Sequence, residues 1–354
     1  MSSAKESTLQ SKYLQGLPDQ GAQVFALTGE LSAALRPWMD KHQRMVALTH
    51  APEKIMRGAR ARQLCLTLAA AAPFLEVREL LPATCMGTWM FVVDELTDEH
   101  ALISSPLWDG LCRFPALFDA PPSAELLAEP TLGPLAEALG DIQEQLRGRS
   151  LFAAVRPELA LSVGDVLKGM AAEELWSTRY QDPSRPPLPG LEEYLEQGAL
   201  QTTGVFPVIV SLLGALEDDS IERHLPRLLE MGRQAAICVR LANDLRTYEK
   251  ELAQGKLNAL GLVQREGMAR EGLGEAEALE RARLGVQARL DAAVARCMSL
   301  GAPENAERTT TRHAERFISN LVAFVCDFYT HHDYHHVLVR QDGNDIDAGT
   351  SAKS

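Results

Sequence analysis

The sequence predicts an all-α protein built as a single-domain helical bundle, and three observations support this prediction. Ala, Leu, Glu and Arg dominate the 354 residues, and these residue types favour helix. Aromatic residues make up only 6%, and clusters of β-branched residues, which would favour strands, are scarce. The hydrophobic content of 46% is ample for a large core, and no break in composition marks a second domain.

The helical spacing of apolar residues, with Pro and Gly at the joints, defines the elements in order. The expected helices cover residues 22–48, 53–73, 77–97, 124–147, 157–181, 190–214, 220–254, 273–299 and 305–337. Residues 1–20 and 341–354 are polar and lack this spacing. We therefore expect two disordered tails on either side of one domain, residues 21–340.

Composition also restricts the class of protein. The net charge of −13 argues against a nucleic-acid partner, which would require a basic surface. No apolar stretch reaches the ~18 residues that a membrane span needs, and the N-terminus lacks the apolar core of a signal peptide. The six cysteines form no CxxC pair and occur mainly in apolar stretches, as buried free thiols do. These features predict a soluble cytoplasmic protein.

The most informative segment is 243–251, which reads Asn-Asp-Leu-Arg-Thr-Tyr-Glu-Lys-Glu. Asn243, Thr247 and Glu251 stand at positions i, i+4 and i+8, so on a helix their side chains share one face. Amide, hydroxyl and carboxylate oxygens suit Mg²⁺, whose shell is completed by water and phosphate. A solvated polar face is the alternative. The preceding residues 235–239 are apolar on all sides, which indicates a buried helix and favours the metal site.

A second acidic group follows the apolar run 89–93. Asp94 and Asp98 share one helical face, and Glu95 and Glu99 share the adjacent one. Carboxylates at the C-terminal end of a buried helix repel each other and oppose the helix dipole, and a divalent cation would relieve both effects. An acidic helix end that faces solvent is the alternative.

The two groups together can hold a metal cluster between two buried helices. Arg240 lies three residues before the triad, and Lys250 lies inside it. Cationic side chains beside metal-binding carboxylates suit an anionic ligand such as diphosphate, and ordinary ion pairing is the alternative for each of them.

These motifs resemble those of class I terpene synthases of the microbial type. The family's second metal motif, Asn-Asp-x-x-Ser/Thr-x-x-x-Glu, is complete at 243–251. Its Asp-rich first motif reads Asp-Glu-Leu-Thr-Asp at 94–98, with Glu in the second place. The resemblance covers about residues 25–337. It implies an all-α fold with a central active-site cavity, an isoprenyl diphosphate substrate and, as a family-level expectation, a homodimer.

The resemblance also implies a metal cofactor, three Mg²⁺ ions with Mn²⁺ as an alternative. The ions would act as Lewis acids on the diphosphate, whose departure leaves an allylic carbocation that cyclises. Asp94, Asn243, Thr247 and Glu251 would be catalytic, and the metal ligands would be Asp94, Glu95, Asp98, Asn243, Thr247 and Glu251.

The chain departs from the family at two places that concern the diphosphate. Many bacterial members carry an Arg sensor in the segment that corresponds to 196–204, where this chain has none. Arg179, on the preceding helix, is a candidate substitute. The C-terminal Arg-Tyr pair of bacterial members corresponds to Asp333 and Tyr334, which makes Tyr334 a candidate diphosphate ligand.

The substrate follows from a narrower resemblance. Residues 240–244 and the expected helix break near 204 resemble plant-type diterpene synthases, which favours a C20 substrate, linear or of the copalyl type. A sesquiterpene synthase acting on farnesyl diphosphate is the alternative.

A head-to-head condensing enzyme would carry two Asp-rich motifs where this chain has one, and the DxDD motif of protonation-initiated cyclisation is absent. The non-enzyme alternative is a catalytically inactive bundle that binds an isoprenoid, which the missing sensor Arg favours.

Aromatic faces can stabilise carbocations, and core packing is the alternative for each candidate. The candidates are Trp89, Phe91, Trp176, Phe206, Phe328 and Tyr329. The break at Thr203 and Gly204 is expected to direct backbone carbonyls at the cation, with an ordinary kink as the alternative. The i, i+4 histidine pairs within 331–336 suit either a transition metal or a polar helix end.

Overall fold

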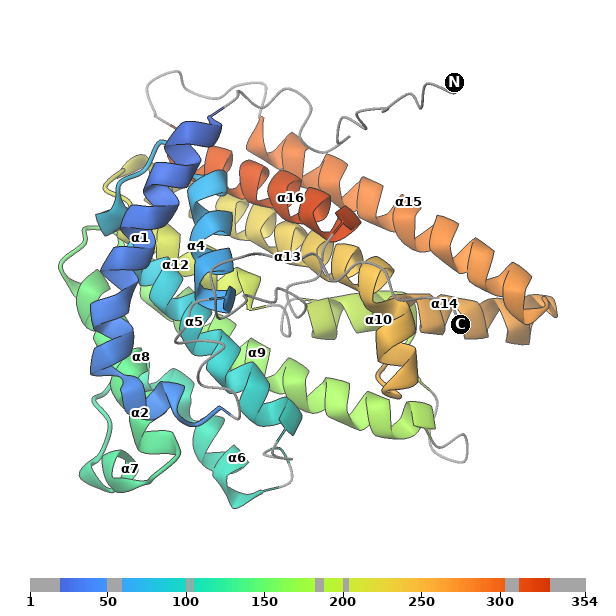
Figure 1. The fold of residues 1–354 in the computed structure, drawn as a ribbon, viewed down its shortest axis with the longest axis horizontal. Helices are drawn as coiled ribbons and strands as arrows, with labels where there is room; N and C mark the ends of the chain where they lie inside the picture. The colour runs from blue at the N-terminus through green and yellow to red at the C-terminus, as the bar shows by residue number, and fades with distance from the viewer. Residues whose placement is uncertain are drawn as a thin grey trace, which may run out of the picture.

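The computed structural model describes residues 20–49, 59–99, 103, 105–181, 188–199, 204–302 and 312–331. Within these ranges every regular element is a helix, so the predicted all-α class is confirmed (Figure 1). Apart from Gln20, the two predicted tails lie outside the described residues. No helix of the described ranges combines the length and the apolar character needed to cross a membrane.

The N-terminal half consists of helices that are mostly short. In chain order they are α1 (Gly21–Lys41), α2 (Gln43–Val46), α4 (Ala59–Ala71), α5 (Val77–Glu99), α6 (Pro106–Leu111), the 3₁₀ segment η2 (Phe114–Phe118), α7 (Ala124–Ala128) and α8 (Leu132–Arg147). The expected helix 124–147 is interrupted between α7 and α8, where the Glu129 carboxylate accepts hydrogen bonds from the backbone N–H groups of Thr131 and Leu132. α6 and η2 were not predicted.

The C-terminal half contains the longer helices. They are α9 (Phe152–Gln181), α10 (Leu191–Tyr194), a single π-helical turn η3 (Leu195–Ala199), α12 (Val205–Ala215), α13 (Ser220–Ala253), α14 (Ala259–Glu271), α15 (Glu275–Gly301) and α16 (His313–His331). α14 was not predicted; it begins because the side-chain oxygen of Asn258 accepts a hydrogen bond from the backbone N–H of Leu260, a typical N-cap.

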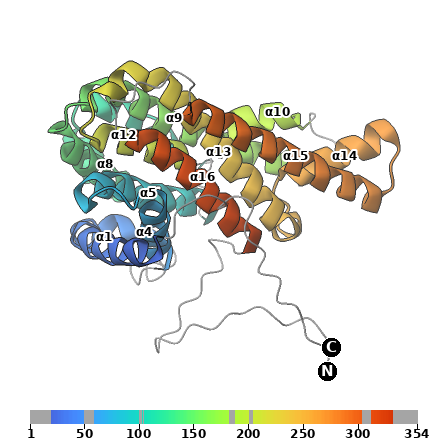
Figure 2. The ribbon, with the colours of Figure 1, turned by 90° about the horizontal axis from the view of Figure 1, so that it is seen from above.

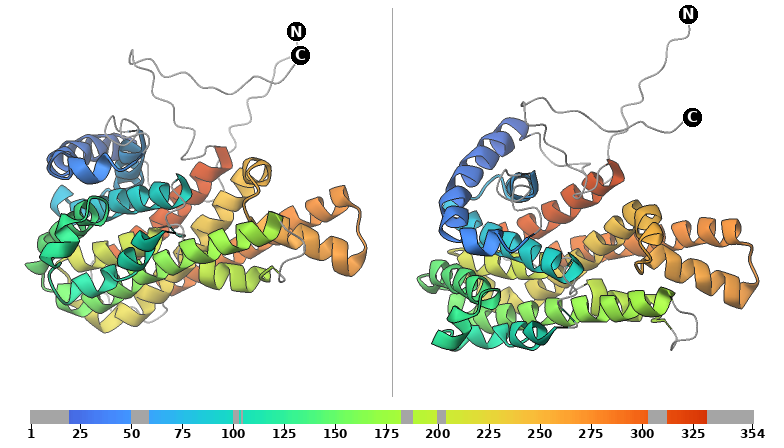
Figure 3. Two further views of the ribbon diagram at one scale, coloured as in Figure 1. Left: turned by 90° about the horizontal axis from the view of Figure 1, so that it is seen from below. Right: turned by 60° about the horizontal axis from the view of Figure 1, so that its bottom comes forward.

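α13 runs through the middle of the bundle and packs against α12, α14, α15 and α16 (Figures 1 and 2). α5 packs against α1, α4, α8 and α12. The hairpin of α14 and α15 extends beyond the other helices at one end of the molecule (Figure 3). Buried apolar side chains of these helices form one continuous core.

α12 is the most apolar element, and residues 206–215 are all buried. The expected helix 190–214 is interrupted immediately before α12, at Gly204. This residue has a positive φ of 63°, which L side chains rarely adopt. A Cβ atom at Gly204 would also lie 3.2 Å from the Cβ of Met90 on α5. The break therefore places the start of α12 against the helix that carries the Asp-rich motif.

Candidate active site

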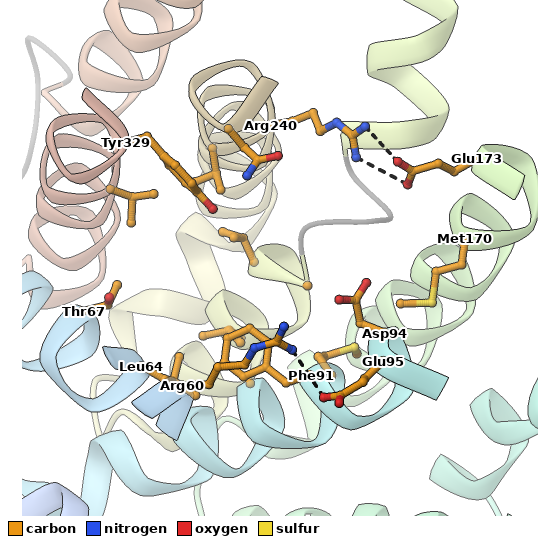
Figure 4. A pocket seen from close by; sticks show the side chains of 18 of the residues that line it. Arg60, Leu64, Thr67, Phe91, Asp94, Glu95, Met170, Glu173, Arg240 and Tyr329 are labelled. Atoms are coloured by element: carbon orange, nitrogen blue, oxygen red, sulfur yellow. Dashed lines mark hydrogen bonds and ion pairs between the residues drawn. The ribbon is translucent and has the colours of Figure 1, made fainter. Parts of the chain in front are cut away.

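A cavity of about 340 Å³ opens between α4, α5, α9, α12, α13 and α16 (Figure 4). Its apolar lining comes from Leu64, Leu68, Met90, Phe91, Met170, Val205, Val208, Val239, Leu321 and Val325. Its polar lining includes Arg60, Asp94, Glu95, Glu173, Arg240, Asn243, Lys250, Glu251, Gln254, Lys256 and Tyr329. An apolar space with charged groups on two sides suits a ligand that has a long apolar body and an anionic group.

α5 brings the Asp-rich motif to this cavity. Gly87, Met90, Phe91 and Asp94 recur at helical spacing, so they share the face that lines it. Asp94 is half-buried, and Figure 4 shows its carboxylate directed into the cavity. Glu95 is instead 3.5 Å from the guanidinium of Arg60 on α4. The side chains of Asp98 and Glu99 lie outside the described part of the chain.

α13 brings the triad to the same cavity. Asn243 and Glu251 line it, and Thr247 lies buried between them. The Thr247 hydroxyl oxygen is 2.9 Å from Oε1 of Glu251 and 2.8 Å from the carbonyl oxygen of Asn243. A hydroxyl has one proton, so it donates to one of these acceptors at a time, and its lone pairs are left for a cation.

The donor set fits a hard divalent cation. Among the described side chains, no three His, Cys, Asp or Glu residues converge on one point. Asp94 lines the cavity from α5, and Asn243 and Glu251 line it from α13. Oxygen-only donors that do not complete a coordination shell suit Mg²⁺, which keeps positions for water and phosphate. The side chains of His331 to His336 lie outside the described part.

Asp244, the second residue of the motif, faces away from the cavity and is fully buried. Its carboxylate is 2.9 Å from Nε of Arg240 and accepts hydrogen bonds from the Tyr194 hydroxyl (2.8 Å) and from the backbone N–H of Ala259 (2.9 Å). Burial raises the pKa of Asp244, although Arg240 and both hydrogen bonds favour its charged form. Asp244 therefore ties α13 to α10 and to the start of α14.

Arg240 lines the cavity, but its guanidinium already has protein partners. It is 3.0 Å from the Glu173 carboxylate, donates from Nε to the Tyr194 hydroxyl at 2.7 Å and lies 4.9 Å from the centre of the Tyr194 ring (Figure 4). Burial would lower the pKa of Arg240, but Asp244 and Glu173 outweigh burial and raise it. The guanidinium therefore stays charged, with two carboxylates beside it.

The sequence interpretation assigned no role in the site to Lys256 and Gln254, which line the cavity next to Lys250. α13 ends in a Schellman motif, in which the N–H of Gly255 bonds to the carbonyl of Leu252 and the N–H of Lys256 to that of Glu251. Gly255 has a φ of 68°, and a Cβ there would lie 2.5 Å from Nε2 of Gln181. The signal for this turn was a Gly directly after a long helical pattern.

The other candidates divide into three groups. Phe91, Gly204 and Tyr329 line the cavity. Trp89, Trp176, Phe206, Phe328 and Arg179 are not part of its lining. Thr203 and Tyr334 lie outside the described residues.

For the tryptophans and Phe206 the structure favours core packing. Trp89 is fully buried and donates from its indole N–H to the carbonyl of Leu135 at 3.0 Å. The Trp176 ring is 5.9 Å from that of Tyr194. The guanidinium of Arg233 lies 5.3 Å from the Phe206 ring. These rings are therefore part of the buried core and not of the cavity lining.

Comparison with solved structures identifies the fold. The 2-methylisoborneol synthase of Streptomyces coelicolor A3(2), solved with Mg²⁺ and 2-fluoroneryl diphosphate, superposes with a TM-score of 0.60 and 19% identity, covering 86% of this chain and 90% of that one. Hedycaryol synthase in complex with nerolidol superposes with a TM-score of 0.57 and 19% identity, covering 86% and 94%. The fold is that of class I terpene synthases.

The family model described as terpene synthase family 2, C-terminal metal binding, matches residues 85–292, more than half of the chain. The chain therefore belongs to the terpene synthase family. The predicted resemblance is thereby confirmed.

Curated relatives are similar over a shorter stretch. The ent-beyerene synthase of Oryza sativa subsp. japonica is 33% identical over 129 residues, which are 35% of this chain and 14% of the rice protein. The dolabradiene synthase of Zea mays is 29% identical over 135 residues, 36% and 15% of the two chains. The chain thus matches only about a seventh of the length of these plant enzymes.

Proposed function

We propose that the protein is a Mg²⁺-dependent class I terpene synthase that ionises an isoprenyl diphosphate, cyclises the resulting carbocation and releases diphosphate. One observation carries the proposal. Asp94 on α5 and Asn243 and Glu251 on α13 line one cavity that also has an apolar lining, with side chains such as Leu64, Val208 and Leu321. Such a cavity can hold a metal-bound diphosphate at its polar side and a hydrocarbon chain in its interior.

In this proposal the metal ligands are Asp94, with Asp98, and the triad Asn243, Thr247 and Glu251. The family description as metal binding and the Mg²⁺ in the Streptomyces coelicolor complex support a divalent metal. The number of three ions remains a prediction, as does Mn²⁺ as an alternative to Mg²⁺. When bound, the metal supplies Lewis-acid stabilisation of the departing diphosphate.

The chain's own residues supply binding and shape. Lys250 and Lys256 bring positive charge to the polar side of the cavity, where they bind the diphosphate oxygens. The apolar lining excludes water, and the faces of Phe91 and Tyr329 stabilise the carbocation. Arg179 and Tyr334 remain predicted diphosphate ligands. The homodimer and the cytoplasmic location also remain predictions.

A C20 substrate, linear or of the copalyl type, is favoured by the plant relatives, which are diterpene synthases. A farnesyl diphosphate substrate is the second candidate, which the similarity in fold to hedycaryol synthase favours. The cavity of about 340 Å³ falls within the ~300–1,000 Å³ typical of small-molecule sites.

The test is to incubate the purified protein and Mg²⁺ with linear C10, C15 and C20 diphosphates and with a copalyl-type diphosphate. We expect diphosphate release and a cyclic hydrocarbon or alcohol, detected by gas chromatography, from a C20 substrate. Turnover of the C15 substrate alone would select the second candidate. Binding of Mg²⁺ and diphosphate without product from any substrate would instead support an inactive isoprenoid-binding bundle.

A further inference from the structure

Asn258 caps α14 and is only 2% exposed, yet its side chain does more than cap a helix. Its oxygen accepts from the backbone N–H of Leu260 at 2.9 Å. Its amide nitrogen donates one proton to the carbonyl of Asp244 at 3.0 Å and the other to Oε2 of Glu251 at 2.8 Å. Only an amide offers an acceptor and two donors at once.

Glu251 is the carboxylate that receives this hydrogen bond. It lies in the last turn of α13, where the helix dipole disfavours a negative charge and a long flexible side chain can rotate into solvent. Thr247 is 2.9 Å from one of its oxygens, and Asn258 donates to the other. Each carboxylate oxygen therefore has one protein partner, which holds the carboxylate at the cavity.

The segment that carries Asn258 is itself anchored. The Schellman turn at Gly255 holds its start, and Gln181 donates from its side chain to the carbonyl of Gly255 at 3.1 Å. The backbone N–H of Leu257 is 3.4 Å from the Ser177 hydroxyl oxygen on α9. The amide of Asn258 is therefore presented to Glu251 by a turn that is tied to both α9 and α13.

We propose that Asn258 is a positioning residue that orients the Glu251 carboxylate for metal binding and so makes the start of α14 part of the metal site. The inference rests on the proposed function, since it takes Glu251 as a metal ligand. Mg²⁺ tolerates little deviation from octahedral geometry, so a ligand that can rotate away binds it poorly. Loss of a hydrogen-bond partner of a metal ligand typically weakens metal binding by ~10–100-fold.

The test compares Asn258→Asp with Asn258→Ser. Both Asp and Ser are good N-caps, so α14 keeps its start. An ionised Asp has no proton to donate to Glu251, and Ser has one hydroxyl proton on a shorter side chain in place of the two amide protons. Tyr248→Phe is the matched control, because the Tyr248 hydroxyl donates to Oε1 of Gln264 at 2.6 Å and also joins α13 to α14, away from Glu251.

The measurement is the Mg²⁺ concentration for half-maximal thermal stabilisation by Mg²⁺ and inorganic diphosphate, with the Mg²⁺ dependence of turnover as a second readout. We expect both Asn258 variants to need ~10–100-fold more Mg²⁺ and Tyr248→Phe to need the wild-type concentration. A wild-type Mg²⁺ requirement in either folded Asn258 variant would overturn the proposal, because Asn258 would then act only as a cap.

The outcome separates this inference from the proposed function. If the wild-type protein binds Mg²⁺ and diphosphate but turns over no substrate, the proposed function fails while the role of Asn258 is still measured. If the wild-type protein turns over substrate and the Asn258 variants show a wild-type Mg²⁺ requirement, only the inference fails. If the wild-type protein binds no Mg²⁺ with diphosphate, both fail.

Discussion

The hydroxyl of Tyr194 lies 2.8 Å from Oδ2 of Asp244, in the fully buried space between α10 and α13. Asn243, the neighbour of Asp244, lines the cavity. Two adjacent residues of one motif thus have different surroundings. Asn243 is available to a ligand, whereas Asp244 joins three helices and neutralises the buried charge of Arg240.

We expect Tyr194→Phe to destabilise the protein. The change removes a hydrogen bond to a charged acceptor and leaves Arg240 with one fewer acceptor in a buried place, which costs about 1–3 kcal/mol. The free energy of unfolding in urea measures this. Tyr180→Phe, at a half-buried tyrosine outside this network, is the control and should cost less.

Asp244→Asn should destabilise the protein more than Tyr194→Phe does. It removes the buried carboxylate partner of Arg240, whose guanidinium keeps Glu173 and the Tyr194 hydroxyl. Breaking a buried ion pair from one side costs about 3–5 kcal/mol. The two substitutions share one network, so the double variant should lose less than the sum of the single losses. Additive losses would show that the two residues act independently.

Asp94→Asn and Asn243→Ala should abolish most turnover while leaving the melting temperature near the wild-type value. Both side chains line the cavity, and neither is part of the core. Loss of a ligand that helps a metal stabilise the leaving group costs several kcal/mol, or at least about 100-fold in kcat/KM. Steady-state kinetics with the best substrate checks this, and full activity in either variant would remove that residue from the site.

Lys256→Met should weaken inhibition by inorganic diphosphate, because Lys256 brings a positive charge to the cavity. A hydrogen bond between charged groups contributes about 1.5–3 kcal/mol, which corresponds to roughly 10–100-fold in the inhibition constant. Lys168→Met is the matched control. Its ammonium pairs with Asp165 at 3.2 Å on the exposed surface of α9, so the inhibition constant should not change.

Acid should destabilise the protein in part through Asp141. Burial would raise the pKa of this carboxyl, but hydrogen bonds from Lys41 (2.6 Å) and His42 (3.0 Å) outweigh burial and lower it below the usual 3.8. A lowered pKa in the folded protein contributes stability that is fully present above pH ~4 and is lost as the pH falls through the folded-state pKa. The stability difference between wild type and Asp141→Asn should therefore shrink below pH ~4 in urea titrations; a constant difference would contradict this.

The sequence predicted the two helices that carry the site because their signals are local. The apolar run before Asp94 and the all-round apolar segment before Asn243 each indicate a buried helix, and α5 and α13 match the expected ranges to within two residues. The i, i+4, i+8 spacing was sufficient to place Asn243 and Glu251 on one face.

The break expected at Thr203 and Gly204 is confirmed at Gly204, but the backbone conformation of this glycine could not be predicted from the sequence. A Gly inside an apolar pattern is compatible with a continuous helix, and the left-handed conformation of Gly204 arises where the start of α12 meets Met90. Trp89 and Trp176 could not be assigned to core or cavity from sequence, because a large aromatic side chain satisfies either place equally well.

By itself, then, the sequence determined the all-α class, the helices α5 and α13 and the oxygen donors that they carry, since these follow from the periodicity of the chain. Only the tertiary structure decided which donors have access to the cavity. Neighbours such as Asn243 and Asp244 are about 100° apart around a helix, so the packing of α13 against α10, α14 and the cavity determines which of them meets a ligand. The same packing brings Asn258, from a helix that the sequence did not predict, into contact with Glu251.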